Sequence, residues 1–363
     1  MSDDLELFPF NIQVLAFNRP QYLEKCLKAL KSQTLPIDPK RIFFWQDGYS
    51  GSKAEYLGLP DKTGKSLELI KRYFPESETF VSVKNVGIGL SYKAAEENAF
   101  VRHNDEWGFF LEEDNILEDY YLKLILQLIE KVKSFDEIVQ VDAFGDYNNQ
   151  PTEEYLIPAH SWAFALRSKH YFERKELLSG YEEILRDHSY FRRDDARIYE
   201  YFSNYGLEVF ATTQDTIKRF LILHFKRIAL TTNFSNAKNI GASGEHFTPE
   251  LYNQLGYQFQ KTTVELKPLP PITEKTIMSL VWNQLRNLSA GFRITKSSWE
   301  SEFRITKSSW ESERDALVGE RDALVGERDA LVGERDAFLS STTWKYTKWL
   351  REGITGAKKF LFN

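Results

Sequence analysis

The chain has 363 residues, which suffices for one large domain or two modest ones with a sizeable core. Hydrophobic residues make up 42% and aromatic residues 15%, so most of the chain is expected to fold rather than remain disordered. The formal net charge of −6 argues against a general nucleic-acid binder, which needs a basic surface.

The first 270 residues alternate between strand and helix patterns. Short apolar runs of the buried-strand type lie at 11–17, 41–45, 79–83, 107–111 and 138–143. Helix patterns lie between them, at 20–31, 66–74, 90–101 and 120–132. Strands separated by helices predict an α/β fold with a mostly parallel sheet flanked by helices on both faces. Ligands bind such sheets beyond the carboxyl ends of the strands, so polar residues after each strand are the first candidates for chemistry.

Polar residues follow the first four expected strands. They are, in chain order, Asn18-Arg19-Pro20, Gln46-Asp47-Gly48, Lys84-Asn85-Val86-Gly87-Ile88-Gly89 and Glu112-Glu113-Asp114-Asn115. Because the carboxyl ends of parallel strands lie at one edge of a sheet, we expect an arginine, two acidic clusters and a glycine turn to meet on one rim.

The acidic triplet Glu112-Glu113-Asp114 is the most informative of these segments. Three carboxylates at the end of a buried strand repel one another, and a divalent cation removes that cost. Hard oxygen ligands of this kind suit Mg²⁺ or Mn²⁺ and leave coordination positions open for phosphate oxygens. The alternative is three carboxylates that point into solvent from a loop, and the apolar strand before them favours the metal interpretation.

The turn Gly87-Ile88-Gly89 has two interpretations. It follows a strand and opens a helix, so its amides could face a nucleotide. As a dinucleotide-binding motif it is incomplete, because Tyr92 stands where a third glycine is expected. The alternative is a tight turn whose glycine needs a positive φ angle.

The order of these motifs resembles the GT-A-type nucleotide-sugar glycosyltransferases over about residues 8–250. It is most similar to their inverting N-acetylglucosaminyltransferase I branch and its bacterial relatives. Later segments extend the resemblance: 161–167 (SWAFALR) to an aromatic acceptor-side segment, 193–197 (RDDAR) to the segment with the catalytic base, and 239–246 (NIGASGEH) to a loop that closes over the diphosphate. The resemblance implies a GT-A (Rossmann-like) fold.

The resemblance also implies roles for the residues at the strand ends. Asp114 is expected to bind the cation directly, and His246 to contact the metal or the diphosphate. The expected nucleotide-sugar contacts are Asn18, Arg19 near the phosphates, Asp47 on the nucleotide base, Asn85, Gly87, and Glu112 and Glu113 near the sugar or ribose. The usual Glu-Asp-Asp is Glu-Glu-Asp here, which leaves open whether Glu113 touches the metal.

The expected catalytic base is Asp195, with Asp194 as the alternative, because the resembling segment supplies that carboxylate. A Trp commonly precedes the base in the family, whereas Arg193 and Asp194 stand there in this chain. A structural interpretation is also open: two acids just before 196–202 favour the amino-terminal end of a helix through its dipole.

The sequence changes character near residue 290. The segment 292–302 (FRITKSSWESE) is repeated at 303–313, and RDALVGE occurs at 314–320, 321–327 and 328–334. Repeats of eleven and seven residues keep one stripe on one face of a helix, so we expect a long, weakly self-associating coiled coil. A solvated spacer helix without a partner is the alternative.

The last segment, 340–363, places aromatic residues on one helical face and lysines on the other. This pattern is typical of a helix that lies in a membrane surface, and the alternative is packing on the protein's own body or on its copies. The expected organisation is therefore a glycosyltransferase-like domain at 1–270, a connecting helix or linker at 271–291, the repeat helix at 292–339 and an amphipathic helix at 340–363.

The expected compartment follows from the single cysteine and from the lack of long apolar stretches. Cys26 excludes a disulfide framework within the chain and suits a reducing environment. The acidic start lacks the features of a secretory signal, and no stretch approaches the roughly 20 apolar residues of a spanning helix. We expect a cytoplasmic protein, either free or peripheral at the inner face of the cytoplasmic membrane.

The leading functional hypothesis is a metal-dependent inverting glycosyltransferase in surface glycan synthesis. Its donor would be a nucleotide sugar, with UDP preferred on the resemblance alone, and its acceptor a glycan or a lipid-linked sugar. One alternative is a nucleotidyltransferase of similar fold, which would release pyrophosphate. The other is a non-catalytic scaffold whose repeat helix is the functional part.

Overall fold

A computed structural model describes residues 7–145, 154–207, 209, 211–244, 248–289 and 333. The chain divides into two units, Met1–Ile294 and Thr295–Asn363. Of the second unit only Gly333 is described, in a helical conformation. Apart from Gly333, the described residues therefore do not include the predicted repeat helix at 292–339 or the predicted amphipathic helix at 340–363. His246 and the predicted self-association also lie outside them.

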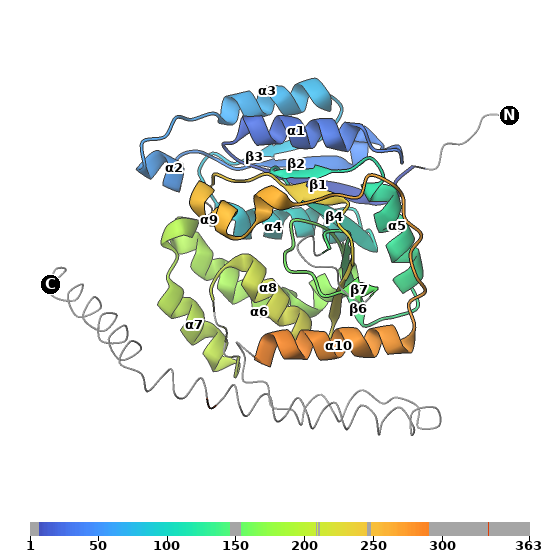
Figure 1. The fold of residues 1–363 in the computed structure, drawn as a ribbon. Helices are drawn as coiled ribbons and strands as arrows, with labels where there is room; N and C mark the ends of the chain where they lie inside the picture. Colours follow the sequence, from blue (N-terminus) through green and yellow to red (C-terminus); the bar gives the residue numbers. More distant parts are fainter. Residues whose placement is uncertain are drawn as a thin grey trace. The chain divides into compact units, whose positions relative to one another are not determined.

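Strands of the first unit form one mixed sheet in the order β3-β2-β1-β4-β8-β6-β9-β7 (Figure 1). Their bounds are β1 Asn11–Ala16, β2 Ile42–Gln46, β3 Glu78–Val81, β4 Trp107–Glu112, β6 Ile138–Asp142, β7 Tyr155–Leu156, β8 Ala163–Arg167 and β9 Ile228–Thr232. The first four strands in this order pair in parallel, as do β6 and β9. Antiparallel pairs join β8 to β4 and β6, and β7 to β9.

A second, two-stranded sheet pairs β5 (Asn115–Leu117) with β10 (Ala237–Asn239) in antiparallel register. The register sets Asn239 opposite Asn115, directly after the acidic triplet. The pairing therefore brings the loop that follows β10 to the carboxyl end of β4.

Helices cover both faces of the main sheet. In Figure 1, α1 and α3 lie on one side of β1–β3 and α4 lies on the other. The helical segments are α1 Pro20–Lys31, α2 Lys53–Tyr56, α3 Thr63–Tyr73, α4 Gly87–Glu97, α5 Tyr121–Val132, α6 Ser168–Asp187, α7 Asp195–Asn204, α8 Gln214–His224, α9 Pro249–Gln254 and α10 Glu274–Ser289, with short turns η1 Pro39–Arg41, η2 Asn98–Arg102, η3 Tyr190–Arg192 and η4 Tyr257–Phe259. The predicted α/β class, with a mostly parallel sheet flanked by helices, is confirmed.

The core follows from the apolar faces of these elements. Every residue of β1 is buried, as expected for a parallel strand covered on both faces. α6, α7 and α8 enclose a further apolar cluster that includes Leu178, Ile198 and Leu221. The helix α10, in the segment expected to connect, buries Ile277 and Leu280 and packs against β7 and β9.

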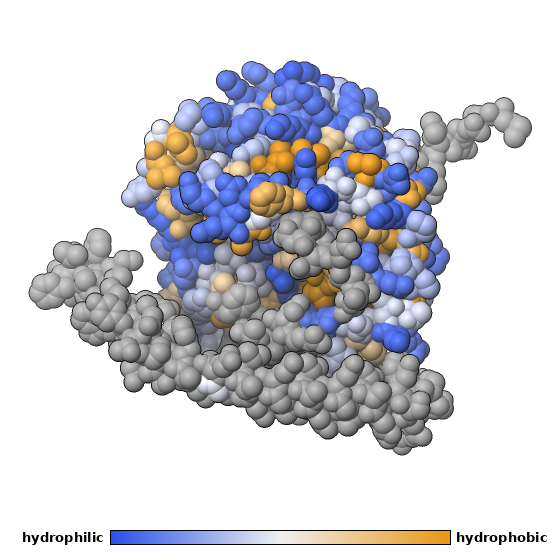
Figure 2. Space-filling model, in the orientation of Figure 1, coloured by the Kyte–Doolittle hydropathy of each residue, from blue (hydrophilic) through white to orange (hydrophobic). Residues whose placement is uncertain are grey.

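The surface visible in Figure 2 is mostly hydrophilic, with scattered hydrophobic groups. Within the described part of the chain, no helix combines the length and the apolar character that crossing a membrane requires.

Candidate active site

A cavity of about 720 Å³ opens at the carboxyl ends of β1, β2 and β4. Its wall includes Arg19, Asp47 and the acidic triplet, all from segments that the sequence placed on one rim. Asn18, Asn85 and Gly87 also line it. The strand-end prediction is therefore confirmed as a placement: these residues gather at one cavity.

Arg19 joins two members of the acidic triplet. Its Nε lies 2.8 Å from Glu113 Oε1, and its Nη1 lies 2.8 Å from Asp114 Oδ2. Burial alone would lower the pKa of Arg19, but the carboxylates of Asp114 and Glu113 outweigh it and raise that pKa. The guanidinium therefore stays charged and neutralises part of the repulsion within the triplet.

Both carboxylate oxygens of Glu113 accept hydrogen bonds from other parts of the protein. Its Oε2 accepts a hydrogen bond of 2.8 Å from the Phe17 backbone amide, while Oε1 accepts from Arg19. Burial raises the pKa of Glu113, and the opposing contributions come from Arg19 and the Phe17 amide. The side chain thus fixes the turn between β1 and α1.

Asp114 lies against the loop after β10. A Cβ built on Gly241 would lie 2.1 Å from Asp114 Oδ2, so only glycine allows this approach. The Ile240 amide donates a hydrogen bond of 2.8 Å to the Asp114 carbonyl oxygen. The loop therefore holds Asp114 at the cavity wall through backbone contacts.

The described residues could hold a divalent cation only together with the phosphate groups of a bound ligand. No group of three or more His, Cys, Asp or Glu side chains in that part of the chain gathers as metal ligands. Asp114 lines the cavity, and Mg²⁺ commonly binds through one or two carboxylates together with substrate phosphates. Asp114 therefore fits a cation that a diphosphate helps to hold.

Glu112 faces the cavity with an elevated pKa. The Tyr92 hydroxyl donates a hydrogen bond of 3.0 Å to Glu112 Oε1. Burial, followed by the negative charge of Asp114, raises the pKa of Glu112 to about 8. A carboxyl group in this setting can carry a proton at neutral pH.

Asp47 organises the turn between β3 and α4. Its Oδ1 accepts hydrogen bonds from the Gly48 and Val86 amides, both at 2.8 Å. Its Oδ2 accepts from the Gly87 amide and from Asn85 Nδ2, both at 2.9 Å. The carboxylate therefore caps the start of α4 from another element, a role that the sequence analysis did not predict.

Gly87 adopts a φ angle of +79°. A Cβ at this position would also lie 2.2 Å from the Cβ of Tyr190. The tight-turn interpretation of the glycine segment is therefore confirmed. Its amide is already donated to Asp47, which leaves nucleotide contact through Gly87 a prediction.

Asn18 ties a second loop to the end of β1. Its Oδ1 accepts a hydrogen bond of 2.5 Å from the Lys62 amide, and its Nδ2 donates one of 3.0 Å to the Pro60 carbonyl. Leu57 and Leu59 in this loop are 58% and 51% exposed and also line the cavity. Asn18 thus fixes a partly apolar rim.

Asp194 and Asp195 lie at the start of α7. The Asp194 side chain accepts a hydrogen bond of 3.0 Å from the Arg197 amide, which makes it the N-cap of that helix. Asp195 accepts from the Thr212 hydroxyl and lies 3.2 Å from Arg193 Nε, with 59% of its side chain exposed. Neither residue is part of the cavity wall, and the capping interpretation accounts for Asp194.

Asp215 is the carboxylate that α8 places in the cavity wall. It follows Gln214 at the start of the helix, and its charge contributes to the raised pKa of Glu112 after larger effects of burial and Asp114. The sequence analysis missed this residue. A usable signal was present, because Thr213-Gln214-Asp215 precedes an amphipathic helix and a buried strand.

Trp162 is an aromatic residue of the cavity wall. The His160 ring stacks on it with a centroid distance of 3.9 Å and an interplanar angle of 2°. The Tyr257 hydroxyl lies 2.6 Å from His160 Nε2, and burial lowers the pKa of His160 to about 4. The neutral imidazole therefore holds the indole in one orientation.

Comparisons with known proteins find matches only among solved structures, at low identity and low TM-score. No protein-family model and no curated protein sequence matches the chain. The structure of S. aureus TarS 1–349 in complex with UDP-GlcNAc is 13% identical with a TM-score of 0.35, over 59% of this chain and 71% of that chain. Mannosyltransferase PcManGT from Pyrobaculum calidifontis, in complex with GDP-Man and Mn²⁺, is 11% identical with a TM-score of 0.38, over 99% of this chain and 90% of that chain. At these TM-scores the likeness supports no assignment of individual residues.

Proposed function

We propose that the protein is a metal-dependent inverting glycosyltransferase. It would move a sugar from a nucleotide-sugar donor, preferably a UDP-sugar, to a hydroxyl group of a glycan or lipid-linked acceptor in surface polysaccharide synthesis. The observation that carries the proposal is one cavity of about 720 Å³ lined by both Asp114 and Asp215. This volume lies within the range of about 300–1,000 Å³ that small-molecule sites occupy.

The donor's diphosphate would lie at the strand ends beside Arg19 and Asp114. Arg19, whose side chain is 24% exposed, pairs with two carboxylates of the acidic triplet, and its Nη1 also lies 3.4 Å from the Ser243 carbonyl oxygen. A guanidinium held in place can contact phosphate oxygens without reorganising during the reaction. The expected contacts of Asn85 and Asp47 with the nucleotide belong to this same end of the cavity.

Asp114 is the residue that would hold the cation, with His246 as the expected second contact. A bound Mn²⁺ or Mg²⁺ would neutralise the negative charge that develops on the departing diphosphate. The protein's own contribution is the fixed position of the Asp114 carboxylate, which Arg19 and the Gly241 backbone hold from two sides.

Asp215 is the base in this proposal, in place of Asp195 or Asp194. The acceptor oxygen forms a bond to the anomeric carbon while its proton passes to an oxygen of Asp215. The bond from that carbon to the diphosphate oxygen breaks, and the diphosphate leaves with the electron pair. Attack opposite the leaving group inverts the configuration, and a positioned base of this kind is worth about 10²–10⁴ in rate.

The acceptor would lie against Trp162 and the rim at Leu57 and Leu59. The indole offers its face to the apolar side of a sugar ring, and His160 keeps that face oriented. The exposed leucines would suit the apolar part of a lipid-linked acceptor.

A donor panel tests the proposal. The full chain is incubated with Mn²⁺ and a set of UDP- and GDP-sugars, with and without saccharide acceptors, and released UDP, GDP and pyrophosphate are measured. Release of a nucleoside diphosphate that requires the cation supports the glycosyltransferase. Release of pyrophosphate from a sugar phosphate and a nucleoside triphosphate would identify the nucleotidyltransferase, and silence across all reactions would favour the scaffold.

A further inference from the structure

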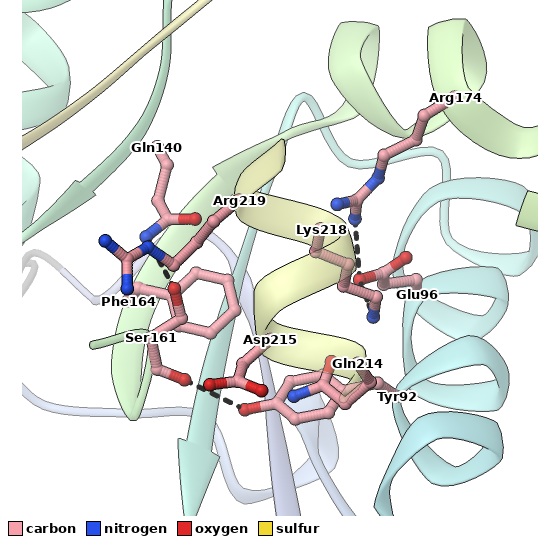
Figure 3. A pocket seen from close by; sticks show the side chains of 10 residues that line it. All are labelled: Tyr92, Glu96, Gln140, Ser161, Phe164, Arg174, Gln214, Asp215, Lys218 and Arg219. Atoms are coloured by element: carbon pink, nitrogen blue, oxygen red, sulfur yellow. Dashed lines mark hydrogen bonds and ion pairs between the residues drawn. The ribbon is translucent and has the colours of Figure 1, made fainter. Parts of the chain in front are cut away.

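Two buried charged side chains meet a third, Lys218, whose side chain is 14% exposed, behind the cavity. Glu96 of α4 is 2% exposed, and Arg174 of α6 is 1% exposed. Arg174 Nη2 and Lys218 Nζ, the latter from α8, each lie 2.7 Å from Glu96 Oε1. Figure 3 shows both cations reaching Glu96 from their separate helices. One carboxylate oxygen thus joins three helices.

Stability alone does not explain this cluster. Removing an ion from water costs several kcal/mol, and replacing a buried ionic cluster by apolar residues of similar size is often neutral or stabilising. Burial raises the pKa of Glu96, but Arg174 and Lys218 outweigh it and lower that pKa. Burial lowers the pKa of Lys218. The ionic contacts are therefore needed to keep Glu96 and Lys218 charged, and they also fix the positions of the helices that carry them.

Through Lys218 and Tyr92, the ionic cluster is connected to Glu112. Lys218 Nζ lies 4.5 Å from the centroid of the Tyr92 ring, which is a cation–π distance. The Tyr92 hydroxyl in turn lies 3.0 Å from Glu112 Oε1 and 3.3 Å from the Ser161 carbonyl oxygen. Burial raises the pKa of Tyr92 well above its ordinary value, so the hydroxyl stays protonated and donates a hydrogen bond to Glu112. Lys218 and Tyr92 thus connect Glu96 to a carboxyl group of the cavity.

Through α8, which carries both Lys218 and Asp215, the ionic cluster is also connected to Asp215. Asp215 and Lys218 are three residues apart on α8, a spacing that puts them on the same face of the helix. Both line a small cavity of about 10 Å³ (Figure 3). Asp215 also lines the large cavity. Anchoring Lys218 therefore anchors the first turn of α8, which carries Asp215.

We propose that Glu96 is a positioning residue that sets the spacing of Glu112 and Asp215 across the cavity. It acts through Lys218, which fixes the Tyr92 ring on one side and the start of α8 on the other. The inference rests on the proposed function, because that function makes Asp215 the base, and the resemblance implies that Glu112 contacts the sugar or ribose of the donor. Glu96 itself lies behind the large cavity and makes no contact with the reactants in this scheme.

Glu96→Gln tests the proposal, with Glu173→Gln as the matched control. Glu173 of α6 pairs with Arg227 through a partly buried ion pair and is absent from both cavities. Both variants lose a carboxylate that holds an arginine. For E96Q we expect kcat of nucleotide release to fall about 10- to 100-fold, as for a small misplacement of reacting groups, with the donor Kd unchanged. E173Q should lower Tm and leave kcat at the wild-type value.

Further variants separate positioning from folding. Lys218→Arg keeps the charge and the reach, so kcat should stay within about threefold of wild type, whereas K218M should match E96Q. The triple variant E96L/R174M/K218M should regain Tm and still lack kcat. Combining E96Q with Y92F should cost less than the sum of the two single losses, because both variants displace Glu112, while only E96Q also displaces Asp215.

Three results would overturn the inference. A folded E96Q with wild-type kcat would remove the positioning role and leave the proposed function intact. Recovery of kcat together with Tm in the triple variant would show that the cluster is merely structural. A wild-type chain that releases no nucleoside diphosphate from any donor would overturn the proposed function, and this inference with it.

Discussion

Arg19 Nη1 lies 2.8 Å from Asp114 Oδ2, so an arginine of the chain itself neutralises the carboxylate that was expected to bind a cation. The same guanidinium reaches Glu113 through Nε. The repulsion that the acidic triplet implied is therefore relieved in part without a metal. A donor-bound cation would have to share Asp114 with Arg19.

Arg19→Met should destabilise the fold by about 3 kcal/mol, because it leaves two buried carboxylates without their cation. Arg102→Gln is the matched control, since Arg102 and Glu78 form a pair with both side chains about half exposed. That variant should lose less than about 1 kcal/mol. Urea unfolding measures both. Adding Mn²⁺ should stabilise R19M more than wild type, and equal stabilisation would contradict the shared-site account.

Asp194→Ala should cost about 1 kcal/mol of stability, since it removes the N-cap of α7. Nucleotide release should be unchanged, because the residue does not line the cavity. Thermal unfolding and the donor panel measure the two effects. A large loss of nucleotide release in a variant that loses only about 1 kcal/mol of stability would indicate that Asp194, not Asp215, is the base.

Gly87→Ala should be strongly destabilising, and Gly58→Ala separates its two causes. Both glycines have positive φ angles, +79° and +67°. A Cβ at Gly58 meets nothing within 4 Å, whereas one at Gly87 would lie 2.2 Å from the Tyr190 Cβ. G58A should therefore show only the backbone cost of about 1 kcal/mol, and G87A considerably more. Equal losses would mean that the Tyr190 contact adjusts freely.

Asp142→Asn should change the pH dependence of stability. Burial raises the pKa of Asp142 from 3.8 to about 7, so the folded state binds more protons than the unfolded state between these values. Its contribution is fully present below about pH 4 and is lost as pH rises to about 7. Between pH 5 and pH 8 the wild type should lose on the order of 1–2 kcal/mol that D142N keeps. If the free energy of unfolding changed equally in wild type and D142N between the two pH values, this prediction would be contradicted.

The helices and strands were predictable because the patterns that indicate them are local in the sequence. The segment 20–31 begins with proline and carries one apolar face, and α1 spans Pro20–Lys31 as expected. Strand ends at one rim follow from parallel pairing alone, which is why the sequence predicts that Arg19, Asp47 and Asp114 meet on one rim, and all three line one cavity.

The roles of single residues were less predictable, because they depend on contacts between distant segments. Asp47 and Glu113 satisfy backbone amides of Gly87 and Phe17, and nothing in their local sequence indicates those partners. Likewise, Asp194 and Asp215 both stand at helix starts. Only the packing of α6, α7 and α8 decides that Asp215 faces the cavity.

The most direct test of the account compares Asp114→Asn with Asp215→Asn for both donor affinity and turnover. With Mn²⁺ and the donor that the panel selects, D114N should lose donor binding in a calorimetric titration. D215N should bind the donor with wild-type Kd and lose about 10²–10⁴ in transfer rate. A D114N variant that binds the donor as tightly as wild type, or a D215N variant that transfers sugar at the wild-type rate, would contradict the account.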